Sequence, residues 1–156
     1  MTIYCHCAEK YERVKNRIHL VAAIVATLCI ALFFTATIFV ELFGSAEAVS
    51  NVKSLIVKPG LFILIPAIAI TGASGFACAK QRRGGLIANK MKRMPFIAAN
   101  GLLILVPCAI TLNQWASSGS FDMTFYIVQG VELIAGATNL ALMGLNIRDG
   151  LRMKVN

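Results

Sequence analysis

Four long runs of apolar residues, separated by short polar segments, organise the chain. A helix needs about 20 residues to cross a bilayer, so each run is long enough to span one. The pattern therefore predicts an all-α membrane protein, a four-transmembrane-helix antiparallel bundle. Its transmembrane domain would comprise residues 18–147, with tails at 1–17 and 148–156. The expected spans are residues 18–43, 55–79, 94–115 and 121–147.

Prolines predict irregularities in the two middle spans. Pro59 lies near the start of the second span, where a first helical turn tolerates its missing N–H. Pro66 lies deeper, where we expect a kink. Pro107 interrupts the third span in the same way.

The fourth run carries a polar stripe. Its members are separated by alternating steps of three and four residues, so they share one face of a helix. Lipid cannot satisfy amides and carboxyl groups, and the stripe is therefore expected to face the bundle interior or a partner. The members of the stripe are Asp122, Phe125, Gln129, Glu132, Gly136, Asn139, Met143 and Asn146.

Glu132 is the residue of the stripe that most needs an explanation. It lies about 15 Å in from Phe121, close to mid-membrane. An ionised side chain at that depth costs at least about 2.5 kcal/mol, so a carboxyl there is a candidate functional group. The alternatives are a protonated structural carboxyl or half of a buried pair. By depth, we expect its neighbours to be Thr27 or Cys29 on the first span, or Thr71 on the second.

Further polar groups lie along the stripe and at similar depths on other spans. Gln129 and Asn139 are candidates for amide contacts that hold helices together. Asn100, Thr71 and Ser74 fall in the same layer as Asn139. Together with Glu132, these residues predict an intramembrane polar site. It is either a hydrogen-bonded network between helices or a small polar cavity.

Composition and charge support the membrane interpretation. The chain is 58% hydrophobic and 14% charged, whereas soluble domains carry about 25% charged residues. The net charge of +8 does not indicate nucleic acid, because the basic residues lie beside the ends of the spans. The two tails and the central connection hold thirteen of them, and the opposite side holds Lys53 and Lys58. This asymmetry predicts that both termini are cytoplasmic, next to anionic lipid headgroups.

Two groups of residues suggest cofactor chemistry. Cys5, His6 and Cys7 place two thiols and an imidazole in three residues, and soft thiolates select Cu(I) or zinc. A closed zinc site needs four ligands, so an ordinary cytosolic tail is the competing interpretation. His19 opens the first span as a candidate ligand of haem b, or as an interfacial histidine that hydrogen bonds near the headgroups.

Five sequence blocks resemble a family of small uncharacterised bacterial four-helix inner-membrane proteins. The resemblance covers about residues 58–152 and implies the same four-helix architecture in a bacterial inner membrane. The blocks are Lys58-Pro59-Gly60, Thr71-Gly72-Ala73-Ser74-Gly75, Ala99-Asn100-Gly101, Phe125-Tyr126 with Val128-Gln129, and Gly144-Leu145-Asn146 with Arg148-Asp149-Gly150.

A weaker resemblance is to haem-binding membrane protoporphyrinogen oxidases and their copper-resistance-like relatives. Those proteins have a histidine on the first helix and a lysine that opens the third. His19 and Lys90 occupy the matching positions here. The resemblance implies that these two residues would contribute to a haem site.

Three classes of function follow from these features. The first is a non-enzymatic subunit, scaffold or assembly factor, acting as a homo-oligomer or within a larger membrane complex. It is favoured because we recognise no catalytic constellation in the sequence. The second is a carrier or conductor of a small solute, metal or proton that uses the Glu132 stripe. The third is a haem-dependent membrane redox protein that uses His19.

Overall fold

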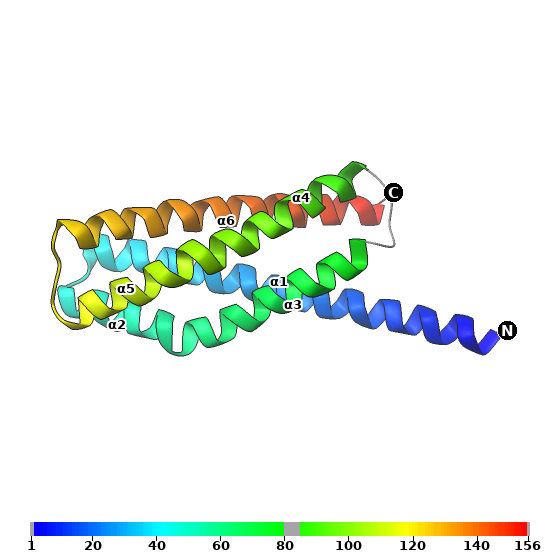
Figure 1. The fold of residues 1–156 in the computed structure, drawn as a ribbon, viewed down its shortest axis with the longest axis horizontal. Helices are drawn as coiled ribbons and strands as arrows, with labels where there is room; N and C mark the ends of the chain where they lie inside the picture. The colour runs from blue at the N-terminus through cyan, green and yellow to red at the C-terminus, as the bar shows by residue number, and fades with distance from the viewer. Residues whose placement is uncertain (1, 80–84, 156) are drawn as a thin grey trace.

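The computed structural model describes the backbone of residues 2–79 and 85–155, and every regular element in those ranges is a helix. Six α-helices run back and forth along one long axis (Figure 1). Two short segments depart from α-helical geometry: a kink within Ile56–Gly60 and a π-helical turn at Gly101–Leu105. The α-helices are α1 (Thr2–Phe43), α2 (Ala46–Leu55), α3 (Leu61–Ala79), α4 (Gly85–Asn100), α5 (Val106–Ser117) and α6 (Met123–Val155).

These helices give four segments long and apolar enough to cross a membrane, which confirms the predicted four-helix fold. α1 forms the first and α6 the fourth. α2 and α3 together form the second, and α4 and α5 the third. The segments are Arg13–Phe43, Ala46–Gly75, Arg93–Ser117 and Met123–Asp149.

The first helix is much longer than a bilayer requires. Its 42 residues rise about 63 Å at 1.5 Å per residue, against a bilayer about 40–45 Å thick including headgroups. The N-terminal part of α1 accordingly extends past the ends of the other helices (Figure 1).

The second span begins nine residues earlier than expected, at Ala46 instead of residue 55. Ser45 caps α2, and its hydroxyl accepts a hydrogen bond from the backbone N–H of Ala48 at 3.3 Å. The chain therefore turns back directly after Gly44. As a result Lys53, which we expected outside the membrane, lies inside the second span.

α3 continues through Pro66 as a helix, and the bend expected at that residue stays a prediction. The second span breaks earlier, at Lys58, whose backbone is extended at φ −133° and ψ 105°. The ring of Pro59 disfavours helical geometry in the residue that precedes it. In the third span the π-helical turn ends at Leu105, which leaves Pro107 in the first turn of α5, where its missing N–H is tolerated.

Two hydrophobic clusters fill the bundle. The larger joins α1, α3 and α6, and the smaller joins α2, α5 and the start of α6. We call the end of the bundle beside Gly44 the Gly44 end, and the opposite end, beside Arg93, the Arg93 end. The members of the larger cluster are Ala26, Ile30, Leu61, Leu64, Ala67, Ile68 and Met143, and those of the smaller are Val49, Leu112, Ala116 and Phe125.

Candidate functional site

A buried ion pair joins α2 to α6. The Nζ atom of Lys53 lies 2.6 Å from Oε2 of Glu132 and donates a hydrogen bond to it. The Lys53 side chain is 0% exposed and that of Glu132 is 12% exposed. A charge removed from water costs several kcal/mol unless it is paired and hydrogen bonded. Each residue therefore supplies the counter-charge that allows the other to lie in the bundle.

Gln129 is the third member of this site, one helical turn before Glu132 on α6. Its Nε2 donates to the same Glu132 oxygen at 3.0 Å. The residue is 4% exposed. Its Oε1 atom is buried and has no hydrogen-bond partner among the described residues. The amide thus supports the ionised carboxylate through its donor, while its acceptor is unused.

Glu41, near the end of α1, brings a second carboxylate to the site. It lies within electrostatic range of both Lys53 and Glu132. Its Oε1 atom is buried and also lacks a hydrogen-bond partner in the described part of the chain. Two carboxylates therefore share one ammonium group, which gives the three residues a net charge of −1 when all are ionised. We call Glu41, Lys53, Gln129 and Glu132 the charged site.

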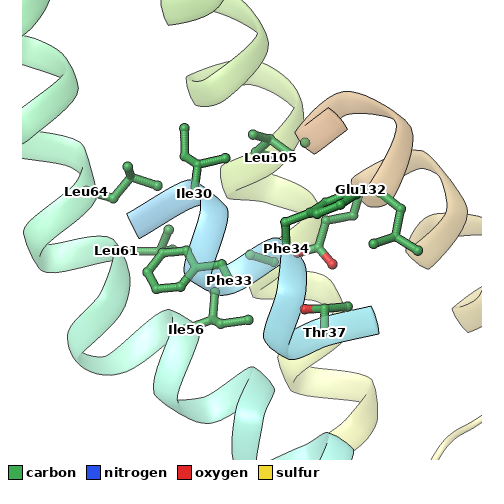
Figure 2. Close-up of a pocket in the computed structure, with 12 residues that line it drawn as sticks. Ile30, Phe33, Phe34, Thr37, Ile56, Leu61, Leu64, Leu105 and Glu132 are labelled. Carbon is green, nitrogen blue, oxygen red and sulfur yellow. The ribbon is translucent and has the colours of Figure 1, made fainter. Parts of the chain in front are cut away.

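A cavity lies next to the charged site, and Glu132 forms part of its wall (Figure 2). All four spans contribute to its lining. Its volume is about 40 Å³, and a water molecule needs about 10–15 Å³ of such space. The cavity can hold a few waters but no larger solute. Its lining comprises Ile30, Phe33, Phe34, Thr37, Ile56, Leu61, Leu64, Leu105, Ala109, Glu132, Leu133 and Gly136.

The polar stripe of α6 faces the bundle interior, as predicted. Phe125 and Asn139 are fully buried, and Gln129, Met143 and Asn146 are at most 9% exposed. The exception is Asp122, which is exposed and precedes the helix. Its carboxylate accepts from the backbone N–H of Phe125 at 3.0 Å and so caps α6.

Asn139 and Asn100 form a second polar contact along the stripe, between α6 and α4. The Nδ2 atom of Asn100 donates to Oδ1 of Asn139 and to the carbonyl of Ala135, both at 2.9 Å. Asn139 in turn donates to the carbonyl of Ile97 at 3.4 Å. This pair matches the hydrogen-bonded network of the two alternatives that the sequence left open.

Thr71 and Ser74 belong to a different contact, with His19. The Nδ1 atom of His19 lies 3.1 Å from the Ser74 hydroxyl and 3.2 Å from the Thr71 carbonyl. Both hydroxyls also donate to carbonyls of their own helix. The six residues expected to form one intramembrane site are thus divided among three contacts: Gln129 with Glu132, Asn100 with Asn139, and Thr71 and Ser74 with His19.

The prediction that Glu132 contacts Thr27, Cys29 or Thr71 is also wrong. Thr27 donates to the carbonyl of Ala23 within α1, and Cys29 packs against the larger hydrophobic cluster. The partner is Lys53, which the expected span boundary had placed outside the membrane. Cys108 on α5 lies within electrostatic range of the Lys53–Glu132 pair.

A second ion pair, not predicted, lies at the Arg93 end, and only its carboxylate is buried. Nη1 of Arg93 on α4 donates to Oδ2 of Asp149 on α6 at 2.9 Å, and the Asp149 side chain is 5% exposed. Arg148 approaches the other oxygen of the same carboxylate at 3.6 Å. Asn146, one turn earlier, is 9% exposed, and its Oδ1 has no partner among the described residues.

The predicted cofactor ligands receive little support. The side chains of Cys5, His6, Cys7 and Lys90 lie outside the described residues. Within the described part, no group of three or more histidine, cysteine, aspartate or glutamate side chains could hold a metal ion. The cavity beside Glu132 is not lined by His19. At about 40 Å³ it is also far smaller than the 300–1,000 Å³ typical of pockets for ligands of drug size, so it does not fit a haem.

The architecture on which these contacts depend is that of a membrane protein with four apolar helices. No protein-family model, curated protein or solved structure matches the chain.

Proposed function

We propose that this chain is a non-enzymatic subunit, scaffold or assembly factor of the bacterial inner membrane. In this role its buried polar groups fasten four spanning helices into a stable body. The observation that carries the proposal is that polar groups of α6 bond to other spans: Glu132 to Lys53 on α2, Asn139 to Asn100 on α4, and Asp149 to Arg93 on α4.

The contact between α6 and α1 supports the same role. A Cβ atom added to Gly136 would lie 3.2 Å from the ring of Phe34, so the two helices approach closely where the glycine has no side chain. Small residues permit such approach in membrane bundles, where interhelical hydrogen bonds and van der Waals packing replace the hydrophobic effect. Every span is therefore tied to α6 by a polar bond or a close helix contact.

The outer faces of the helices fit a bilayer as the surrounding partner. Large apolar side chains such as Leu28, Phe62, Leu103 and Ile134 are exposed on them, each by more than 60%. In the proposed orientation both termini are cytoplasmic, where the basic residues at the Arg93 end would meet anionic headgroups. The same apolar faces would meet a second copy of the chain or other subunits of a complex.

A carrier function is the second candidate, and the cavity bordered by Glu132 favours it. Of the spans that line this cavity, the second is kinked within Ile56–Gly60 and the third contains the π-helical turn Gly101–Leu105; Ile56 and Leu105 lie in the lining. In secondary transporters, interrupted helices beside a mid-membrane site are a typical arrangement. The cavity volume of about 40 Å³ limits such a cargo to a proton or a small ion with its water.

One double variant separates the two candidates. Lys53→Met/Glu132→Gln removes both charges of the pair together, so neither ion of the pair is left without its partner. In cells that lack the native chain, a subunit or scaffold carrying both substitutions should reach the membrane in normal amount and restore the phenotype of the native protein. The matched control is Lys58→Met, which removes an exposed lysine of the same span.

A different result with the same double variant would contradict the proposal. If the double variant folds and accumulates like the native chain but fails to restore the phenotype, the ionisable groups themselves are required. The carrier function would then replace the structural one.

A further inference from the structure

The charged site contains two unused hydrogen-bond acceptors and one more negative than positive charge. The acceptors are Oε1 of Gln129 and Oε1 of Glu41, both buried. Buried polar atoms in native proteins are nearly always hydrogen bonded, so each such atom requires an explanation. Each of these acceptors lacks a donor, and the site as a whole lacks one positive charge. One added proton would balance the charge and supply one of the two missing donors.

We propose that Glu132 binds an exchangeable proton, and that Lys53 moves from Glu132 to Glu41 when it does so. The proton comes from a hydronium ion, which leaves as water. It forms an O–H bond on the Glu132 carboxylate, and the net charge of Glu41, Lys53 and Glu132 changes from −1 to zero. This inference goes beyond the proposed structural role, which does not depend on it.

Gln129 is suited to both protonation states of Glu132. An amide carries donors on its nitrogen and an acceptor on its oxygen. With Glu132 ionised, Nε2 donates to the carboxylate at 3.0 Å and Oε1 is unused. After protonation, a half-turn of the amide presents Oε1 to the new carboxyl O–H. The unused acceptor of the first state thus becomes the partner in the second.

Lys53 and Glu41 are suited to the same exchange. A lysine ammonium has three donors on a flexible four-carbon stem. Oε1 of Glu41 is a buried acceptor without a donor among the described residues, and its carboxylate already interacts electrostatically with Lys53. When Glu132 becomes neutral, the ammonium keeps a counter-charge by moving to Glu41. Both unused acceptors are therefore filled in the protonated state.

The positions of the groups along the spans give the proton a short path. Glu41 lies about 20 Å, Lys53 about 11 Å and Glu132 about 6 Å from the middle of their respective spans, at 1.5 Å per residue. Glu41 is close to the end of α1, where Phe43 is 76% exposed. The cavity beside Glu132 has room for waters. The Gly44 end is therefore the surface nearer to Glu132. Cys108 on α5 also lies in electrostatic range of Lys53 and Glu132.

Infrared difference spectroscopy on the purified full chain in lipid nanodiscs tests this directly. Acidification between about pH 9 and pH 4, a range that spans ordinary and raised carboxyl titrations, should produce the C=O band of one protonated carboxyl in an apolar environment. Deuterium exchange should shift that band. Glu132→Gln should remove it. Glu47→Gln is the matched control, because Glu47 is exposed in the first turn of α2, and it should leave the band unchanged.

Two further variants keep the test decisive if Glu132→Gln does not fold. Glu41→Gln removes the second counter-charge for Lys53, so the band should appear only at a proton concentration about tenfold higher. This change is equivalent to about 1.4 kcal/mol. Gln129→Leu removes the amide, so the remaining carboxyl band should shift in frequency.

The proposal is overturned if the native chain shows no such band, or if the band persists unchanged in both Glu41→Gln and Gln129→Leu. In the last experiment the same spectra are recorded after sodium chloride replaces choline chloride. Loss of the band on adding sodium at constant pH would assign the site to a metal cation and overturn the proton assignment.

Discussion

Removal of one charge of the Lys53–Glu132 pair should destabilise the bundle more than removal of both. At the observed separation of 2.6 Å, Coulomb's law with an effective dielectric constant of about 20 gives an attraction of about 6 kcal/mol. Desolvation of the two ions offsets much of this gain. An ion left without its partner still bears the full desolvation cost. Lys53→Met should therefore lower the free energy of unfolding by about 3–5 kcal/mol.

Glu132→Gln should cost about 3 kcal/mol, at the lower end of the range for a broken buried pair. Its effect is smaller because Glu41 lies within range of Lys53 and offers a second counter-charge. In Lys53→Met/Glu132→Gln no buried ion of the pair remains, and Gln129 can still bond to the new amide. The double variant should therefore be more stable than either single variant.

Unfolding by increasing amounts of SDS in mixed micelles measures these free energies. Trp115 is the single tryptophan of the chain and packs against the smaller hydrophobic cluster, so its fluorescence reports the loss of tertiary structure. Lys58→Met is the matched control, expected within about 0.5 kcal/mol of the native chain as an exposed substitution. The reasoning is refuted if the double variant is as unstable as the sum of the two single variants.

Two further predictions concern the middle of the bundle and its orientation. Asn139→Leu removes one of the two acceptors of the Asn100 amide and leaves the carbonyl of Ala135 as the other. It should lower the free energy of unfolding by about 1–3 kcal/mol in the same SDS assay, and an unchanged value would show that the amide pair contributes nothing. Reporter domains fused after Asn156 and inserted at Gly119 should lie on opposite sides of the membrane, with the C-terminal one cytoplasmic. Protease protection in oriented vesicles checks this, and protection of both on one side would contradict the four-span orientation.

The four spans and the inward face of α6 could be predicted because each depends on one physical rule. A spanning helix needs a long apolar run, and polar groups cannot face lipid. Asn139 and Gln129 follow the second rule and are buried. The pairing of helices could not be predicted, because hydropathy does not determine which polar groups contact each other. For that reason the single site expected from depth alone is divided into three contacts.

We expected Lys53 outside the membrane because a lysine usually marks the end of an apolar run. A signal for its burial was nevertheless present in the spacing. Val49, Lys53, Ile56 and Gly60 follow one another at steps of four, three and four residues, and all four are buried. The stripe that identified the inner face of α6 thus has a counterpart on the second span, with a base where α6 carries an acid. A search for facing stripes of opposite charge would have found the pair.

The same comparison separates the two ion pairs of α6 by their depth. Asp149 lies about 20 Å from the middle of the fourth span and Glu132 only about 6 Å from it. Half of the hydrocarbon core is about 15 Å thick, so Arg93–Asp149 falls at the headgroups and Lys53–Glu132 within the hydrocarbon. If its partner is lost, a charge at the headgroups can be solvated or screened. A charge within the hydrocarbon can be stabilised only by other protein groups, or it must become neutral. The deep pair is therefore the one at which an amide with an unused acceptor has consequences, while Glu41, about 20 Å from the middle of its own span, lies nearer the headgroups. If Glu132 lay at the depth of Asp149, water could hydrogen bond to the acceptor of Gln129 and no exchange of partners would be needed.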